Sequence, residues 1–372
     1  MRTRTSFLRV LAGASIFLFP ATGSGQRVAS QGVPPLDHVF LIVIENHGLD
    51  RIIGDSTPAP YLTKLSRNAN VARQYFAVGH PSLPNYLEIV GGSNFGVGGD
   101  LTPDWHGRLH DSSLVAPLAG GGTDLSTPAV FTGAAGGRDI LPAHYTAATI
   151  ADQLSAAGKS WRSYQEDLPA AGADGVNFSD GIYSNLSGAL ADSVSWLYAV
   201  KHDPFVYFAS VQEGKSPAHS LRNIAGFDGL HGLYADLRAG AVPNFAFIVP
   251  DQCHDMHGLR GAGFFCARDS TLVQMGDRTV ERLVDAIEGS PAWKSGHDVI
   301  IITWDENDSA VRPNRVPFIL ITNYGVAGTA SDVPYNHFSL LRTLESAFGL
   351  PCLNHACDAE VKLMADLFAR PR

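Results

Sequence analysis

The sequence has few charged residues and no excess of basic ones. Asp, Glu, Lys and Arg make up 17% of its 372 residues, and the formal net charge is −9. Apolar residues make up 45%, so the chain can bury a large core, which excludes global disorder. Because no basic field is present to neutralise phosphates, we do not expect nucleic-acid binding. An acidic protein that binds a phosphate ester needs a local cation instead.

Long apolar runs are also absent. The stretch "FLRVLAGASIFLF" near the N-terminus is shorter than the ~20 residues that a membrane-spanning helix requires, and no later stretch is long enough, so we expect no stable membrane span. Arg2 and Arg4 precede this stretch, and the small residues of "PATGSGQ" follow it. This order is typical of a signal peptide over residues 1–25, with an uncleaved anchor as the alternative. We therefore expect an exported protein, either periplasmic or extracellular.

Cysteine is scarce: the chain contains only Cys253, Cys266, Cys352 and Cys357. An even number in an exported protein indicates disulfides. Pairing Cys253 with Cys266 and Cys352 with Cys357 closes the shortest loops. A zinc site is the alternative, but the spacing fits no common zinc pattern.

What the sequence does contain is an alternation of apolar strands and helical segments. This pattern predicts an α/β fold with a mainly parallel central sheet and helices on both faces. The expected strands are residues 38–44, 204–209, 244–249, 299–304 and 316–322, and the expected helices are 146–158, 275–289 and 336–349. Residues 93–143 are Gly-rich and too long for an ordinary connection, so we interpret them as a long loop insertion. Residues 33–372 then form a single domain.

Acidic side chains follow three of the expected strands. Glu45 and Asn46 come after the first, Asp251 after 244–249, and Asp305 and Glu306 after 299–304. Because ligands bind at the carboxyl ends of parallel strands, these side chains are expected to converge, although solvated loop residues are the alternative. Acids gathered in a dry site need raised pKa values or a cation. Oxygen ligands, the Asn46 amide included, favour Ca²⁺, Mg²⁺ or Mn²⁺ and leave zinc possible.

A serine lies at the start of an expected helix within "GHPSLPNYLEIVGGS", residues 79–93. Pro84 is well tolerated in a first helical turn, which puts Ser82 at or near the helix start. The free N–H groups there favour an anion. Ser82 is then either an ordinary cap or a nucleophile that a neighbouring metal activates to attack phosphorus. Asn85 can reach a phosphoryl oxygen, although an amide at that position is commonly structural.

Histidines and acids are dense in "PDQCHDMHG", residues 250–258. Asp251, His254, Asp255 and His257 suggest metal binding, phosphate binding or proton delivery. A polar surface loop is the alternative. His337 opens the helix expected at 336–349, where a lone histidine is usually a cap or a surface residue.

Five motifs in order resemble the phosphoesterase family of secreted acid phosphatases and bacterial phospholipases C, within the alkaline phosphatase superfamily. They are "IENHGLD", "GHPSLPNYLEIVGGS", "PNFAFIVPDQCHDMHG", "ITWDEND" and "YNHFSLLRTLESAFGLP". The resemblance extends from Leu36 to about Pro351 and implies an alkaline-phosphatase-like sheet.

The resemblance also implies roles for individual residues. Ser82 would be the nucleophile, and His257 and His337 would act on the phosphate or the leaving group. Asn85 would hold a phosphoryl oxygen. Asp255, His257 and His337 fall where the superfamily places its second metal site, or where relatives with one metal place substrate-binding histidines. We also assign His80, His254 and Asp255 to substrate binding. A metal would be held by Glu45, Asn46, Ser82, Asp305 and Glu306. Typical superfamily members have Asp-His in place of Asp305-Glu306, so zinc is in doubt and the number of metal ions is one or two.

These assignments predict a secreted, metal-dependent acid phosphatase that forms a phosphoseryl intermediate. Its substrate would be a small phosphate ester or a phospholipid head group, and some relatives act on phosphoinositides. A phospholipase C or another phosphodiesterase is the nearest alternative. A sulfatase or phosphonate hydrolase and an exported protein that only binds phosphate or metal are more distant ones.

Overall fold

The structure is a computed structural model that describes residues 32–54, 58–95, 100, 146–168, 197–259, 262–308, 311–325 and 327–368. The expected signal peptide and most of the expected insertion at 93–143 lie outside these residues. Among the described residues, every helix is too short or too polar to cross a bilayer.

Eight strands form the main sheet of the described residues, in the order β5-β4-β6-β1-β7-β8-β2-β9. Their bounds are β1 His38–Ile44, β2 Asn70–Ala72, β4 Trp161–Gln165, β5 Ile224–Gly226, β6 Phe245–Val249, β7 Asp298–Trp304, β8 Phe318–Thr322 and β9 Ala330–Ser331. From β5 to β7 all neighbours are parallel, and β8 is antiparallel to both β7 and β2. The prediction of a mainly parallel sheet is confirmed. A second, small pair joins β3 (Tyr75–Phe76) to β10 (Tyr335–Asn336).

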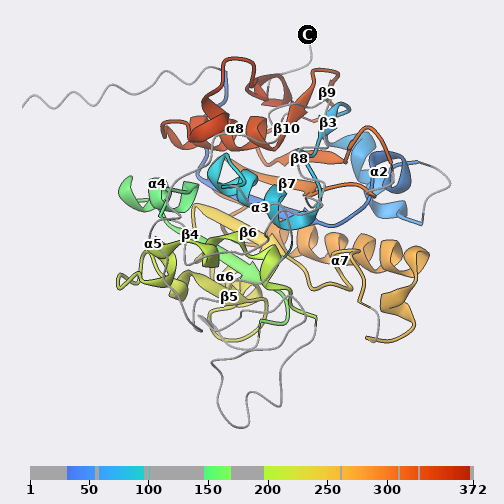
Figure 1. Ribbon diagram of the computed structural model, residues 1–372, viewed down its shortest axis with the longest axis horizontal. Helices are drawn as coiled ribbons and strands as arrows, with labels where there is room; N and C mark the ends of the chain where they lie inside the picture. The colour runs from blue at the N-terminus through green and yellow to red at the C-terminus, as the bar shows by residue number, and fades with distance from the viewer. Residues whose placement is uncertain are drawn as a thin grey trace, which may run out of the picture.

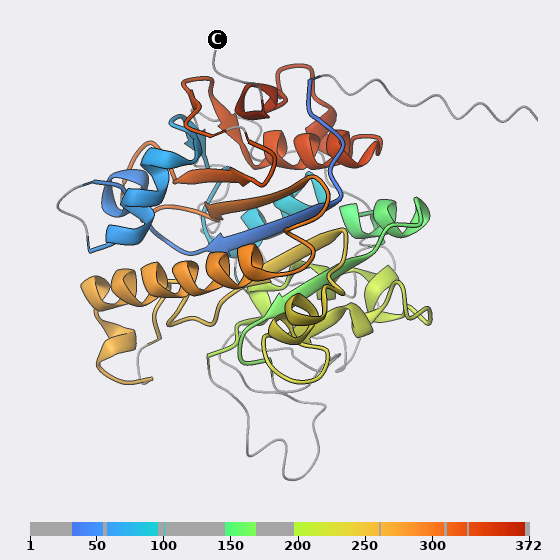
Figure 2. The ribbon, with the colours of Figure 1, turned by 180° about the vertical axis from the view of Figure 1, so that it is seen from behind.

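Helices cover both faces of this sheet. On one face α3 packs with α4 and α8, and on the other α7 packs with α2 and α6. Figure 1 shows α3 in front of the strands, and Figure 2, seen from behind, shows α7 in front of them. The α-helices are α1 Leu49–Ile52, α2 Pro60–Asn68, α3 Ser82–Gly91, α4 Ile150–Ala156, α5 Ala209–Gln212, α6 Leu233–Ala239, α7 Asp269–Gly289 and α8 His337–Phe348.

The central strands β1 and β7 have almost no polar residues because both of their faces are covered. All seven residues of β7 are buried, as are six of the seven in β1. Burying such runs of Val, Ile and Leu gives ~25 cal/mol for each Å² of apolar surface removed from water. The two strands pair in register, with Ile44 opposite Trp304. The residues that follow them, Glu45 and Asp305, therefore leave the sheet side by side.

One expected strand is wrong. Residues 204–209 fold as the 3₁₀ helix η4 (Pro204–Tyr207) followed by α5. Pro204 fixes φ and has no N–H to donate to a sheet, and it begins η4. The run is apolar because it is buried, and periodicity alone does not separate a buried helix from a buried strand.

Both expected disulfides are present. Cys253 is bonded to Cys266, and Cys352 to Cys357. Cys253 and Cys266 are buried with Leu272 in a small apolar cluster of their own. The first bridge therefore ties the segment that contains His257 to the start of α7.

We expect removal of the Cys253–Cys266 bridge by a double substitution to alanine to lower the free energy of unfolding by about 3 kcal/mol. The sequence separation is 13 residues, and closing a loop of that length restricts the unfolded chain by about this amount. Urea denaturation of the two oxidised proteins measures the difference. The same change at Cys352 and Cys357, separated by 5 residues, is the control and should cost less. Equal stability of the first variant and the unchanged protein would contradict the expectation.

Candidate active site at the ends of the central strands

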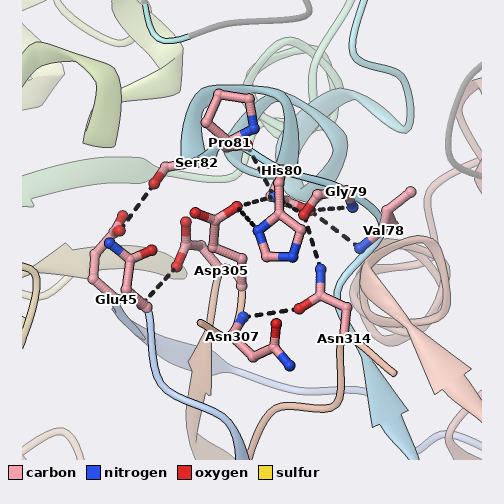
Figure 3. Close-up of polar contacts among 12 residues, drawn as sticks. Glu45, Val78, Gly79, His80, Pro81, Ser82, Asp305, Asn307 and Asn314 are labelled. Carbon is pink, nitrogen blue, oxygen red and sulfur yellow. Dashed lines mark hydrogen bonds and ion pairs between the residues drawn. The ribbon is translucent and has the colours of Figure 1, made fainter. Parts of the chain in front are cut away.

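Glu45, Ser82 and Asp305 meet in the interior of the protein, where β1 and β7 end and α3 begins. The Ser82 hydroxyl donates to Glu45 Oε2 at 3.0 Å, and all three side chains are buried. The hydrogen-bond pattern of the sheet continues past β7, since the Asp305 N–H donates to the Ile44 carbonyl. Figure 3 shows the helix start carrying Ser82 above the two carboxylates. The expected convergence is therefore present for Glu45, Asp305 and Ser82. It is wrong for Asp251, which instead contacts His254 in a separate group.

The backbone conformation of Asn46 allows its side chain and that of Glu45 to face inward together after β1. Its φ is +54°, in the left-handed region that asparagine tolerates better than most residues. This conformation turns the chain, so Asn46 no longer points away from the face that Glu45 occupies. The Asn46 backbone N–H lies 3.4 Å from Asp305 Oδ1.

The side chains of Glu45, Asn46 and Glu306 face one another in this cluster. One end of the Asn46 amide lies 2.9 Å from Glu306 Oε1 and 3.2 Å from Glu45 Oε2. With its nitrogen at that end the amide donates to both carboxylates, and with its oxygen there all three groups can serve as ligands of a cation. Asp305 Oδ2 is also buried and has no hydrogen-bond partner among the described residues. The donor set therefore fits a hard divalent ion.

The ionisation of the carboxyl groups in the cluster also indicates a cation site. Burial, followed by the neighbouring charge of Glu45, raises the pKa of Asp305 and of Glu306 well above the usual range of a carboxyl. Burial also opposes ionisation of Glu45, but His202, Lys201 and His257 outweigh it, so the pKa of Glu45 is lowered. The full set of acids can be ionised together only when positive charge is added among them.

His202 is a site residue that the sequence did not indicate. It ends the 3₁₀ helix η3 (Val200–His202), and its two ring nitrogens lie 3.0 Å from Glu45 Oε1 and 3.1 Å from Asp255 Oδ2. Burial disfavours its protonation, but Glu45 and Asp255 outweigh burial and raise its pKa to about 9. His202 precedes the apolar run that resembled a strand, and no motif spacing relates it to Glu45.

Lys201, next to His202, is a second missed residue. Its Nζ lies 2.8 Å from Asp100 Oδ2 and 3.2 Å from His257 Nε2.

Nitrogen ligands are also available beside the oxygen cluster. Glu45, His202 and His257 offer ligand atoms within 4.8 Å of one another. A cavity of ≈ 350 Å³ opens next to this group and is lined by Asn46, His257 and Glu306 among others.

A model of the phosphoesterase family matches residues 55–351. The chain belongs to the phosphoesterase family. Ser82, Asp305 and Glu306 lie within the matched range, and Glu45 and Asn46 precede it. Family membership confirms the expectation of a hydrolase that acts on phosphate esters.

Curated relatives of this phosphoesterase include a phosphatidylinositol phosphatase and several acid phosphatases. A phosphatidylinositol-3-phosphatase of Mycobacterium tuberculosis is 26% identical over 89% of this chain and 83% of its own length. A phosphate-repressible acid phosphatase of Penicillium chrysogenum is 27% identical over 82% of this chain, which spans only 58% of the fungal protein. Haemolytic phospholipase C of Pseudomonas aeruginosa is 23% identical over 51% of this chain and 30% of its own length. A solved structure of an alkaline phosphatase superfamily protein from Vibrio parahaemolyticus is similar with a TM-score of 0.48 at 14% identity, over 85% of this chain and 67% of its own.

Asn85 does not have the expected access to a phosphoryl oxygen. Its Oδ1 accepts hydrogen bonds from the Val78 and Gly79 N–H groups. Its Nδ2 donates to the Gly79 and Pro81 carbonyls and lies 3.3 Å from Glu306 Oε2. Every polar atom of this buried amide is therefore engaged. Asn85 fixes the turn that leads into Ser82, which is the structural alternative for this residue.

His337 lies behind Asp305 and not beside a substrate. It is fully buried, with Nε2 2.7 Å from the Asp305 carbonyl and Nδ1 2.9 Å from the Tyr75 hydroxyl. Burial lowers its pKa to about 4, so it donates to the carbonyl as a neutral ring. The expectation that it protonates a leaving group is wrong for this arrangement, because both nitrogens are occupied.

His257 borders the cavity but is not the expected acid. Its Nδ1 donates to the Gly258 carbonyl, which leaves Nε2 as an acceptor facing Lys201. Burial and the charge of Lys201 lower the pKa of His257 to about 4. Asp255, expected to bind substrate, instead contacts His202 and accepts from the His257 N–H. Both residues support the cluster around Glu45.

The two remaining substrate-binding assignments have different outcomes. His80 Nδ1 lies 2.8 Å from Glu306 Oε2, so His80 belongs to the cluster, and burial and Arg312 lower its pKa to about 4. His254 instead contacts Glu166 and Asp251, each at 2.9 Å, in a separate group. Burial opposes protonation of His254, but these two acids raise its pKa to about 10. The described structure gives His254 no contact with Ser82 or Glu45.

Proposed function

We propose that this chain is an exported, metal-dependent phosphomonoesterase whose nucleophile is Ser82. The observation that carries the proposal is the hydrogen bond from the Ser82 hydroxyl to Glu45 inside a buried cluster of acids. The acid phosphatases and the phosphatidylinositol-3-phosphatase among its relatives support a monoester substrate, including a phosphoinositide head group. We further propose that residues 33–372 form one catalytic domain behind a signal peptide at 1–25.

The first step follows from the position of Ser82. Its hydroxyl already donates to Glu45, so the proton has an acceptor when the oxygen attacks phosphorus. Ser82 is the first residue of α3, a helix of 10 residues, and the first-turn N–H groups and the helix dipole favour an anion there. Attack forms the phosphoseryl bond and breaks the ester bond, and the leaving oxygen takes up a proton from solvent to become the alcohol. Water then cleaves the phosphoseryl bond, which gives inorganic phosphate and restores the Ser82 hydroxyl.

Glu45, Asn46, Asp305 and Glu306, together with Ser82, would hold the metal ion. When bound, a divalent ion supplies positive charge that permits the acids to be ionised and lowers the pKa of a hydroxyl. The oxygen atoms favour Ca²⁺, Mg²⁺ or Mn²⁺. His202 and His257 beside Glu45 also suit zinc or a second ion. His337 and Asn85 keep Asp305 and the turn before Ser82 in place.

The test is an activity panel on the purified protein with each divalent ion added in turn. It compares a phosphomonoester, a phosphatidyl diester, a phosphoinositide and a sulfate ester between pH 5 and pH 8. We expect the monoester and the phosphoinositide to be hydrolysed fastest. Preference for the phosphatidyl diester would indicate the phospholipase C alternative, and preference for the sulfate ester a sulfatase. Phosphate binding without turnover of any ester would indicate a binding protein.

A further inference from the structure

A carboxylate from outside the acid cluster lies at the start of the helix that carries Ser82. Asp100 Oδ1 accepts a hydrogen bond from the Leu83 N–H at 3.0 Å. Its other oxygen accepts from Lys201 Nζ at 2.8 Å. Leu83 directly follows Ser82, so one oxygen of Asp100 contacts the residue next to the nucleophile and the other contacts Lys201.

Lys201 differs from an ordinary surface lysine. Its side chain is only 7% exposed, whereas that of Asp100 is 31% exposed. Burial disfavours the charged form of Lys201, but Asp100 and then Glu45 outweigh it and raise the pKa of the amine. A buried cation is costly unless an anion lies against it. Asp100, the more exposed of the two side chains, supplies that anion.

Two donors from different parts of the chain therefore define a position for an anion next to Ser82. One is a backbone N–H in the first turn of α3, and the other is the ammonium of Lys201. A phosphoryl group, like a carboxylate, presents several oxygens on one atom. Its oxygens could therefore accept from both donors in place of the Asp100 carboxylate.

We propose that Lys201 binds a terminal oxygen of the substrate's phosphoryl group and selects phosphomonoesters over diesters. This inference rests on the proposed function and deepens it. A monoester dianion has three terminal oxygens and two negative charges, whereas a diester has two such oxygens and one charge. A cation directed at the additional oxygen stabilises the monoester more, because charge-assisted hydrogen bonds are roughly twice as strong as neutral ones.

The alternative is that the Lys201–Asp100 pair only anchors Asp100 to the protein. In that case its loss would reduce the hydrolysis of both kinds of ester equally, through poorer positioning of Ser82. The relative rates for two esters that share a leaving group therefore separate substrate recognition from anchoring.

The experiment compares Lys201→Met with the unchanged protein on 4-nitrophenyl phosphate and methyl 4-nitrophenyl phosphate. We expect kcat/KM for the monoester to fall by about 30- to 100-fold and that for the diester by less than about threefold. The inhibition constant of inorganic phosphate should rise by a factor similar to the fall in kcat/KM for the monoester. Lys64→Met, which removes an exposed lysine on α2, is the matched control and should change neither ester. Equal losses for the two esters, or unchanged phosphate inhibition, would overturn the proposal.

A second variant covers the case in which Lys201→Met does not fold. Asp100→Asn removes the charge that competes for Lys201, so we expect inorganic phosphate to bind at least about threefold more tightly. Unchanged or weaker binding would overturn the proposal. Calorimetric titration with phosphate reads this effect without turnover. Failure of the proposed function, meaning no hydrolysis of any ester by the unchanged protein, is thereby distinguished from failure of the role of Lys201.

Discussion

Replacing Ser82 by alanine should abolish hydrolysis of every phosphate ester while leaving the protein folded. The change removes one hydroxyl at the first residue of α3 and leaves Glu45 Oε2 without its donor. A single lost hydrogen bond of this kind alters stability by only about 1 kcal/mol. Loss of a nucleophile lowers kcat by roughly 10⁴-fold or more, because no other group can form the covalent intermediate.

Steady-state kinetics and thermal unfolding of the same preparation measure both parts of this prediction. Ser339→Ala is the control, since Ser339 is also a buried serine near a helix start, and its hydroxyl contacts Asn336 at 3.2 Å. It should retain turnover. A Ser82→Ala protein with ordinary phosphatase rates would remove Ser82 from the mechanism. Trapping phosphate on Ser82 by rapid acid quench would give independent support for the phosphoseryl intermediate.

Replacing Asp305 by asparagine should have opposite effects on stability and on activity. Burial and the charges of Glu45 and Glu306 raise the pKa of Asp305. An acid whose pKa is higher in the folded protein than in the unfolded chain costs stability at any pH above its unfolded value. In the presence of chelator at pH 7, the variant should therefore be at least as stable as the unchanged protein. Turnover with metal should fall by about 10²- to 10³-fold.

The measurement that separates these effects is thermal unfolding with and without the divalent ion, combined with metal analysis. An ion at 100 times its Kd stabilises the unchanged protein by about 2.7 kcal/mol, and the variant should gain clearly less. Asp298→Asn is the matched control, because Asp298 is a buried acid at the other end of β7 and contacts His38. It should retain the bound ion and the activity. Full activity of the unchanged protein after exhaustive chelation would contradict the metal requirement.

The sequence predicted the part of the site that depends on strand ends. Runs such as "VIIITW" are long, apolar and β-branched, and in a parallel sheet such strands end at a common edge. The strand ends therefore predicted that Glu45 and Asp305 lie together, whereas the place of Ser82 beside them was implied by the family resemblance. The disulfide pairs followed from loop length for a similar reason, since both are local.

The remaining part of the site depends on contacts that residue spacing does not encode. Lys201 and His202 lie in an irregular segment before an apolar run, and only the packed fold brings them to Glu45. Asn85 and His337 have the right chemistry for substrate contact, but tertiary hydrogen bonds occupy their polar atoms. Whether a buried side chain has a free donor is a property of all its neighbours, and most of these are distant in sequence.

The pairing of β1 with β7 also bears on how the protein folds. Asn46 and Asp305, which it brings into contact, are separated by 259 positions in the chain. Contacts between residues so distant in sequence form late, because a long loop must close first and its closure costs conformational entropy. Such contacts slow folding. The closing step also brings like charges together. Divalent ions should therefore accelerate refolding of this chain, and a chelator should prolong the period in which its unpaired strand edges are open to aggregation.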